Sequence, residues 1–315
     1  MIRMRVTRKW SEALDIVGCE MMAADGGVLP AFEAGAHVDL HLGNGLVRQY
    51  SLCNPPWETH RYEIAVRLDE RSRGGSAAVH NLVEEGHVIE VSLPKNLFPL
   101  SESEGRTLLF AGGVGITPII AMADTLCNSG RDFELHYFTR SDERTAFRSR
   151  ILASPYARSV FFHVGEAADT SDSVVKTFSE TSQSAQLYVC GPGGFMDHIV
   201  DTSKRLGWAA QNIHTERFSA APVTSDAGAF VLRLTRSNRE VFVPHDKTVV
   251  EALADAGVEI PTSCEQGICG TCLTPVRSGV VDHRDHYLTE AERQRNDQFL
   301  PCCSRSKSPE LVLDI

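Results

Sequence analysis

Short stretches in which hydrophobic and polar residues alternate dominate the first hundred positions of the chain. They predict strands at 4–7, 37–42, 48–52, 62–66 and 88–92, with turns rich in Gly, Asn and Pro between them. Alternation with a period of two is typical of half-buried strands, and many short strands at this spacing favour a small antiparallel β-barrel. One short helix, at 76–82, is expected among these strands.

From residue 106 the pattern changes to an alternation of strands and helices. We expect strands at 107–111, 134–138, 160–164 and 187–190, and helices at 119–126, 146–152, 174–180 and 194–206. The first of these strands is continuously apolar, as expected for a parallel sheet that is covered on both faces. The alternation predicts an α/β domain with a doubly wound parallel sheet, which binds its ligand at the carboxyl ends of the strands.

A polar segment that contains Pro, 219–228, has the composition of a linker. After it we expect a strand hairpin at 230–235 and 240–243, an amphipathic helix at 248–256 and a final strand at 311–315. This layout is that of an α+β domain with the β-grasp fold. The pattern therefore divides the chain into three domains, at 1–102, 103–222 and 228–315.

Nine cysteines occur in the chain, and five of them lie in its C-terminal fifth. Cys264, Cys269 and Cys272 have the spacing C-x4-C-x2-C, and Cys302 follows thirty residues later. Four thiolates in this pattern are typical of a plant-type [2Fe–2S] ferredoxin. A zinc site is the alternative, but zinc usually pairs one C-x2-C with a second or with two histidines, and no such mate is present. Cys302 and its neighbour Cys303 compete for the fourth position, since adjacent side chains diverge and only one should reach the iron.

Two further features bear on a metal site. Gly267 and Gly270 allow the backbone to curl closely around a cluster and offer N–H donors to it. His283 and His286 lack a third ligand at a usable spacing, so we expect surface positions for them rather than a metal.

The composition adds limits to this picture. The chain has 315 residues, 42% of them hydrophobic, which is enough for two or three domains. A net charge of −10 argues against nucleic-acid binding, which needs a basic surface. The basic N-terminus lacks the apolar stretch of a signal peptide, and no apolar run is long enough to span a membrane. Because thiolate-bound clusters also favour a reducing compartment, we expect a soluble cytoplasmic protein with no membrane partner.

One strand of the first domain carries a candidate cofactor motif. Arg48, Tyr50 and Leu52 share one face of this strand, and Ser51 points to the other. A guanidinium binds phosphate through two hydrogen bonds, and an aromatic ring can flank a flavin.

A second candidate opens the predicted helix and consists of Arg73, Gly74, Gly75 and Ser76. Bare backbone amides at the start of a helix suit an anion such as a phosphate. Taken alone, either motif also fits an ordinary strand or an ordinary turn.

Two glycine-rich turns follow predicted parallel strands. The first contains Gly112, Gly113, Gly115, Thr117 and Pro118, and the second contains Cys190, Gly191 and Pro192. The carboxyl ends of such strands are where a nucleotide pyrophosphate and a nicotinamide would bind. The common G-x-G-x-x-G fingerprint is absent, and a tight turn without a ligand is the alternative.

The end of the second parallel strand bears on the choice of nucleotide. Arg140 and Ser141 could contact a 2′-phosphate, whereas Asp142 and Glu143 would repel one. NADPH therefore remains open beside NADH.

In this order and over nearly the whole length, the motifs resemble those of the phthalate dioxygenase reductase family, which includes the vanillate demethylase reductases. These are the FMN- and [2Fe–2S]-containing reductase components of two-component Rieske oxygenase systems. The resemblance implies FMN at the 48–52 strand and the 73–76 turn, and NADH at the two glycine-rich turns. It implies catalytic positions for Ser51, near the flavin N5 edge, and Cys190, near the nicotinamide. The C-x-S-R motif of related reductases selects Cys302 as the fourth ligand, and the C-terminal place of the ferredoxin domain supports FMN over FAD.

The expected route of the electrons follows from counting them. NADH gives up two electrons as a hydride and an iron–sulfur cluster accepts one, so a flavin must lie between them. The resemblance implies onward transfer to a separate terminal oxygenase that acts on aromatic compounds as a dioxygenase, monooxygenase or demethylase. An electron-transfer subunit of a larger flavoprotein complex and an iron–sulfur redox sensor are the alternatives.

Overall fold

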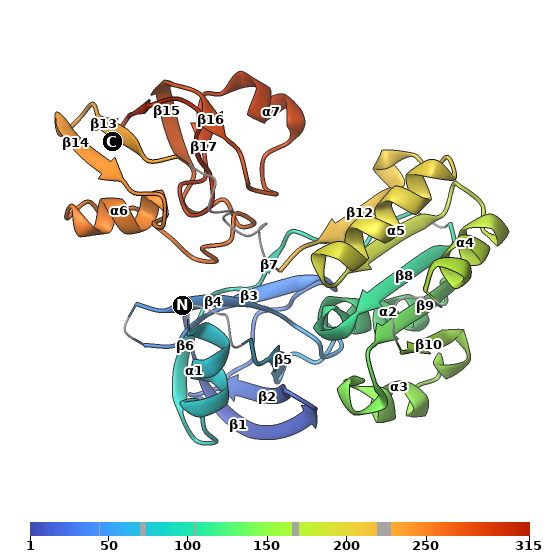
Figure 1. The fold of residues 1–315 in the computed structure, drawn as a ribbon. Coiled ribbons are helices and arrows are strands. Elements are labelled where there is room, and N and C mark those ends of the chain that lie inside the picture. Colours follow the sequence, from blue (N-terminus) through green and yellow to red (C-terminus); the bar gives the residue numbers. More distant parts are fainter. Residues whose placement is uncertain (44, 70–73, 104, 166–169, 219–227) are drawn as a thin grey trace. The chain divides into compact units, whose positions relative to one another are not determined.

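The structure is a computed structural model, and it describes residues 1–315 except 44, 70–73, 104, 166–169 and 219–227 (Figure 1). The chain folds into two compact units, Met1–Glu216 and Arg217–Ile315. The first contains an antiparallel and a parallel sheet, and the second contains a mixed sheet. The expected linker falls almost entirely on 219–227 and so lies outside the described residues.

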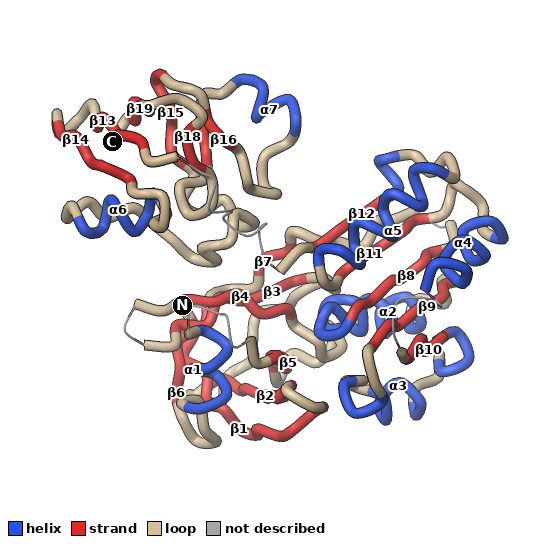
Figure 2. Tube along the Cα trace, viewed as in Figure 1, coloured by secondary structure: helices blue, strands red, loops and turns tan. Residues whose placement is uncertain are grey.

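An antiparallel sheet forms the first part of the first unit, with the strand order β4-β3-β6-β1-β2-β5 and with β7 paired to β3 (Figure 2). Its elements are β1 (Ile2–Ala13), β2 (Ile16–Ala23), β3 (Ala36–His41), β4 (Val47–Ser51), β5 (Tyr62–Arg67), α1 (Gly75–Asn81), β6 (Val88–Val91) and β7 (Lys95–Asn96). The strands at the two ends of the order, β4 and β5, are also in contact. The sheet therefore closes around its apolar core as a barrel.

The sequence pattern does not predict β2, and the reason is local. Gly18 interrupts the alternation of this strand, because the indole ring of Trp10 on the neighbouring β1 occupies the space that a side chain would need. Because Gly18 has no side chain, the ring of Trp10 can pack directly over its backbone.

The rest of the first unit is a parallel sheet with the strand order β10-β9-β8-β11-β12. Its elements are β8 (Thr107–Gly112), α2 (Ile116–Asn128), β9 (Phe133–Thr139), α3 (Arg148–Ala153), β10 (Val160–Val164), α4 (Thr170–Glu180), β11 (Gln186–Cys190), α5 (Gly193–Arg205) and β12 (Ile213–Glu216). The chain order reverses between β8 and β11, and the carboxyl ends of these two strands form the switch point at which open α/β sheets bind ligands. The sequence pattern predicts every one of these strands except the short β12.

A buried ionic network joins the barrel to the helices of the parallel sheet. The Arg150 guanidinium on α3 lies 2.6 Å from the Asp124 carboxylate on α2 and 3.3 Å from the Glu63 carboxylate on β5. The Tyr156 hydroxyl donates a further hydrogen bond of 2.8 Å to Asp124. Burial raises the pKa of Asp124, and the Arg150 charge acts against that rise. The guanidinium therefore offsets the cost of two carboxylates that are largely removed from water.

The second unit is a mixed sheet with the strand order β14-β13-β19-β15-β17, together with a separate ladder of β16 and β18. Its elements are β13 (Phe230–Leu234), β14 (Arg239–Val243), α6 (Val249–Asp255), β15 (Thr274–Ser278), β16 (Val281–Asp282), α7 (Glu290–Arg295), β17 (Gln298–Phe299), β18 (Arg305–Ser306) and β19 (Glu310–Leu313). The β13–β14 hairpin beside the parallel pairing of β13 with β19 gives the β-grasp arrangement. The predicted hairpin, helix and final strand are confirmed, whereas α7 and the short strands β15–β18 were not predicted.

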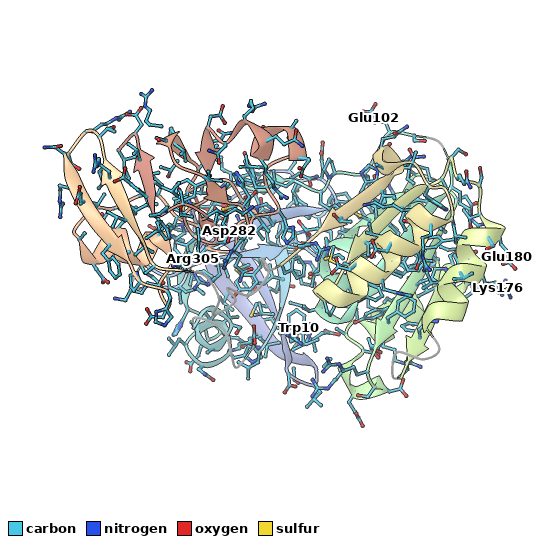
Figure 3. The ribbon with its side chains drawn as sticks, turned by 45° about the horizontal axis from the view of Figure 1, so that its top comes forward. Trp10, Glu102, Lys176, Glu180, Asp282 and Arg305 are labelled. Atoms are coloured by element: carbon cyan, nitrogen blue, oxygen red, sulfur yellow. The ribbon has the colours of Figure 1, made fainter. Side chains whose placement is uncertain are left out.

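Arg305 is a fully buried arginine that ties distant parts of the second unit together. Its guanidinium donates hydrogen bonds to the backbone carbonyls of Lys247, Pro244 and Gly228. Asp282 stands opposite it in the β16–β18 ladder, and both residues are labelled in Figure 3. Because Arg305 follows Cys302 by three residues, these bonds anchor the segment that carries the fourth cysteine.

The Arg150 network leads to a prediction about stability. Arg150→Met keeps an unbranched apolar stem but leaves Asp124 and Glu63 without their cation, and we expect a loss of about 3 kcal/mol in the free energy of unfolding. All three tryptophans, Trp10, Trp57 and Trp208, lie in the first unit, so urea unfolding followed by tryptophan fluorescence reports on that unit.

The matched control is a second ion pair between the barrel and the parallel-sheet part. Arg144 lies 2.7 Å from Asp15, and both side chains are about two-fifths exposed, at 39% and 41%. Arg144→Met should therefore cost less than about 1 kcal/mol. Equal losses for the two variants would contradict a special contribution of the buried network.

Candidate functional site

The structure brings the two candidate cofactor motifs of the barrel together. Arg48 lies on β4, and its side chain crosses the turn that leads into α1. A Cβ at Gly75 would lie 2.8 Å from the Arg48 Nε, so only glycine leaves room for the arginine. Gly74 has a φ of 85°, a left-handed conformation that glycine adopts without penalty. Arg73 lies outside the described residues.

The other residues of these motifs take different positions. Tyr50 is partly buried on β4, and burial raises the pKa of its hydroxyl. Leu52 follows the strand and is fully buried in the barrel core. The Ser76 hydroxyl accepts a hydrogen bond of 3.0 Å from the backbone N–H of Asp69, which closes the loop before α1. Ser76 thus has a structural partner inside the barrel.

Ser51, Cys190 and Glu216 form a polar group at the carboxyl edge of the parallel sheet. The Ser51 hydroxyl, at the end of β4, donates a hydrogen bond to the Glu216 carboxylate, with 3.5 Å between the oxygens. Cys190 and Glu216 are paired across β11 and β12, at the last residue of each strand. Two residues predicted from separate motifs, Ser51 and Cys190, therefore lie on either side of one carboxylate.

The protonation of this group follows from its burial. Burial raises the pKa of Glu216 to about 8, although the Ser51 hydroxyl acts in the opposite direction. Burial also raises the pKa of the Cys190 thiol, and the nearby Glu216 adds to that effect. Both groups therefore hold their protons at neutral pH. Sequence reasoning missed Glu216, because the strand that presents it, β12, was not predicted and no motif marks it.

The two glycine-rich turns pack against each other. A Cβ at Gly115 would overlap the backbone carbonyl of Cys190, and a Cβ at Gly191 would lie 3.0 Å from the Gly112 Cα. Gly113 has a φ of 52° and begins the single 3₁₀ turn that leads into α2. The glycines thus allow two backbones to touch at the switch point of the sheet.

The side chains beside these turns are already hydrogen-bonded or packed within the protein. The Thr117 hydroxyl donates a hydrogen bond of 3.0 Å to the Val114 carbonyl, and Pro118 is buried in the first turn of α2. A Cβ at Gly112 would lie 2.9 Å from both Pro192 and the ring of Phe195. Backbone groups, rather than free side chains, are what these turns offer to a ligand.

Acidic side chains are prominent at the end of β9. The Ser141 hydroxyl donates a hydrogen bond of 3.0 Å to Glu143, and Asp142 forms an ion pair of 3.1 Å with Arg148. Arg140 is exposed beside them. The serine that could have bound a 2′-phosphate is thus held by a carboxylate.

In the second unit the four predicted cysteine ligands gather around one point. The Cys264 thiol interacts with those of Cys269 and Cys302, and the Cys302 thiol also interacts with that of Cys272. Three of the four residues are buried, and Cys269 is partly exposed. The backbone N–H of Gln266 donates a hydrogen bond to the Cys264 sulfur at 3.3 Å, as expected where a thiolate is to be stabilised.

The glycines of this loop fit the same purpose. Gly267 and Gly270 have φ values of 69° and 73°, and a Cβ at Gly270 would overlap the ring of Tyr287. A Cβ at Gly267 would overlap the Cys303 sulfur, so Cys303 packs against the loop. Cys303 also lies 3.7 Å from the Leu300 carbonyl oxygen.

The donor set of four cysteines fits a two-iron cluster. Among the described residues, no group of three or more His, Cys, Asp or Glu side chains is arranged to hold one metal ion. In a [2Fe–2S] cluster each iron takes two protein thiolates, and the four gathered cysteines supply that number.

The expectation that both histidines of His283-x-x-His286 lie on the surface is wrong for one of them. The His283 side chain is only 10% exposed, and its Nδ1 lies 3.5 Å from the Asp285 carboxylate. His286 is exposed as expected.

In the part of the chain that the structure describes, no helix combines the length and the apolar character needed to cross a membrane.

Comparisons with known proteins agree with this organisation. The family described as "2Fe-2S iron-sulfur cluster binding domain" matches residues 232–307. Vanillate O-demethylase oxidoreductase of Pseudomonas sp. (strain HR199 / DSM 7063) is 49% identical over 317 residues, which cover 100% of both chains. Phthalate dioxygenase reductase of Burkholderia cepacia is 39% identical over 317 residues, which cover 100% of this chain and 97% of that protein.

A solved structure described as phthalate dioxygenase reductase, "a modular structure for electron transfer from pyridine nucleotides to [2Fe-2S]", is also similar. It has a TM-score of 0.82 and 38% identity, and the match covers 100% of this chain and 98% of that one. The predicted fold class is thereby confirmed, with a flavin-binding antiparallel barrel, a parallel-sheet nucleotide domain and a C-terminal ferredoxin domain.

The raised pKa of Glu216 leads to a prediction about pH and stability. The folded protein keeps this proton up to about pH 8, whereas the ordinary carboxyl loses it near 4.5. The contribution of this protonated carboxyl to the free energy of unfolding is therefore fully present below pH 4.5. It is lost as the pH rises through about 8. Glu216→Gln has no proton to lose, so above about pH 8 its melting temperature should exceed that of the wild type, and the two should converge below about pH 5.

Glu180→Gln, on the exposed surface of α4, serves as the control for the loss of a carboxyl group. It should follow the wild-type pH dependence. A Glu216→Gln variant that also follows it would show that Glu216 titrates as an ordinary surface carboxyl.

Proposed function

Because this chain belongs to the phthalate dioxygenase reductase family, which includes the vanillate O-demethylase oxidoreductases, we propose that it moves electrons from NADH through FMN and a [2Fe–2S] cluster to a separate Rieske-type terminal oxygenase. The observation that carries the proposal is the convergence of Ser51 and Cys190 on Glu216, where the barrel meets the carboxyl edge of the parallel sheet. A flavin held by the barrel and a nicotinamide held by the sheet would meet there. When bound, FMN would supply the chemistry that links a two-electron hydride donor to a one-electron cluster.

The barrel residues would hold the flavin. The Arg48 guanidinium and the backbone amides of Gly74 and Gly75 would bind its phosphate, together with Arg73 and Ser76 of the same turn. Tyr50 would flank the ring system, and Ser51 and Leu52 would border it with their backbone. The packing of Arg48 across Gly75 supports this assignment, since it places cation and amides together.

The parallel sheet would hold NADH. Its backbone groups at Gly112, Gly113 and Gly115 would receive the pyrophosphate, with Thr117 and Pro118 fixing the turn. Cys190, Gly191 and Pro192 would border the nicotinamide. The carboxylates around Ser141 would repel a 2′-phosphate, which favours NADH over NADPH.

The residues at the reacting edge would position the two rings and keep the site uncharged. A neutral Cys190 thiol would border the nicotinamide without acting as a nucleophile, because burial keeps it protonated. A protonated Glu216 would place no negative charge beside the two bound rings. Ser51 fixes the orientation of that carboxyl. The transfer needs no general base from the protein.

The second unit would carry the cluster on Cys264, Cys269, Cys272 and Cys302. We assign the flavin domain to 1–102, the nucleotide domain to 103–222 and the ferredoxin domain to 228–315. A cluster held by thiolates is best kept in a reducing compartment, which supports a cytoplasmic location. The substrate is chosen by the oxygenase partner, which is expected to act on an aromatic compound as a dioxygenase, monooxygenase or demethylase.

A pair of cysteine variants tests the electron route. Cys302→Ser should remove the visible absorption of the cluster and lower NADH-driven reduction of cytochrome c by at least about tenfold, because one iron loses a ligand. The same variant should keep its NADH:ferricyanide activity, since ferricyanide can take electrons from the flavin.

Cys303→Ser is the matched control, because this neighbour packs against the ligand loop without being one of the four ligands. It should retain both the absorption and the cytochrome c activity. Loss of the cluster in Cys303→Ser but not in Cys302→Ser would reverse the ligand assignment. A wild-type chain that does not oxidise NADH would instead favour an iron–sulfur sensor.

A further inference from the structure

Asp285 is a completely enclosed carboxylate in the second unit, with a side chain that is 0% exposed. One of its oxygens, Oδ2, accepts a hydrogen bond of 2.8 Å from the backbone N–H of Leu288. The other, Oδ1, accepts one of 3.3 Å from the Ser304 hydroxyl. Burying an ionised carboxylate is costly, so the enclosure of the Asp285 side chain needs an explanation.

The Asp285 segment packs directly on the loop that carries three of the cysteines. A Cβ at Gly267, in the middle of that loop, would lie 3.0 Å from the Asp285 Cα and 3.2 Å from its Cβ. The backbone N–H of His286 donates a hydrogen bond of 2.9 Å to the Gly267 carbonyl. On its other side Asp285 binds Ser304, which is two residues from Cys302. One residue thus connects both segments that supply cysteines.

An arginine and a histidine side chain lie near the carboxylate. Arg293 on α7 approaches Asp285 Oδ2 to 3.8 Å and donates a hydrogen bond to the Asp285 backbone carbonyl. The Nδ1 of His283 lies 3.5 Å from Oδ1. These groups compensate for the buried charge only in part, because a buried ion pair seldom repays its desolvation. A neutral amide could still accept from Leu288 through its oxygen and donate to the Ser304 hydroxyl through its NH2 group, at a lower desolvation cost, so the negative charge itself calls for a function.

We propose that Asp285 is a positioning residue of the cluster site, which fixes the two cysteine-bearing segments by its hydrogen bonds and lowers the reduction potential of the site by its charge. The inference rests on the proposed function, since it requires a cluster at the four cysteines. An electron that enters the site adds a negative charge close to a buried carboxylate, and the repulsion is weakly screened in a medium of low dielectric constant. A lower potential favours release of the electron to the partner protein.

Two substitutions at Asp285 in the full-length chain separate the two roles. Asp285→Asn keeps an oxygen that can accept from the Leu288 N–H and an NH2 group that can donate to the Ser304 hydroxyl, but it removes the charge. It should therefore keep its iron while the midpoint potential shifts to a more positive value. Asp285→Ala removes the hydrogen bonds as well, and it should release iron to a chelator roughly tenfold faster than the wild type. The potential is measured by spectroelectrochemical titration, and iron content and visible circular dichroism report on the cluster independently of turnover.

Matched controls come from the neighbouring charges. Asp282 is paired with Arg284 at 2.7 Å and is 26% exposed, so Asp282→Asn should leave the potential close to that of the wild type. On α7, Arg293→Gln should shift the potential to a more negative value. Arg295→Gln should not, because Arg295 is 55% exposed and pairs with Asp297 instead.

The outcomes separate the inference from the proposed function. An unchanged potential in Asp285→Asn, together with an unchanged potential in Arg293→Gln, would overturn the electrostatic role. Iron release from Asp285→Ala at the wild-type rate would overturn the positioning role. Should Asp285→Asn fail to fold, the comparison of Arg293→Gln with Arg295→Gln still tests the charge. A wild-type chain without cluster absorption would refute the proposed function instead.

Discussion

The contact between the Gly115 backbone and the Cys190 carbonyl is the constraint on which the first unit depends. It allows the ends of β8 and β11 to approach until their turns touch, and that approach defines the edge at which ligands of a parallel sheet bind. Glu216, on the next strand, is carried to the same edge by its pairing with Cys190. Ser51 of the barrel then reaches it. A side chain at position 115 would collide with the Cys190 carbonyl and push the two turns apart.

Much of the fold could be predicted from the sequence because strong patterns mark it. Three patterns were reliable guides: the apolar strands of the parallel sheet, the glycines after them and the C-x4-C-x2-C spacing. In the structure they correspond to buried strands, closely packed turns and gathered cysteines. β2 was missed because Gly18 makes way for Trp10, a contact between strands that no local pattern records. α7 was also missed, although Thr289 and Glu292 form a capping box that marks its start.

The candidate site was predictable only where a residue belongs to a motif. Arg48 and Gly75 come from separate motifs, and only the folded chain shows that the glycine makes room for the arginine. Glu216 and Asp285 belong to no motif, because their importance comes from burial and from partners distant in the sequence. The surface expectation for His283 failed for the same reason. Tertiary enclosure changes the chemistry of a side chain without leaving a local signal.

The hydrogen bonds of Arg305 set a limit on how the ferredoxin domain can be recombined with other proteins. This buried guanidinium binds the carbonyl of Gly228, the last residue of the expected linker, from a position three residues beyond Cys302. The start of the domain is therefore part of the support of its fourth cysteine. A transplantable module must begin before Gly228, and a chimera joined even a few residues later would disturb the cysteine segment at the opposite end of the domain sequence.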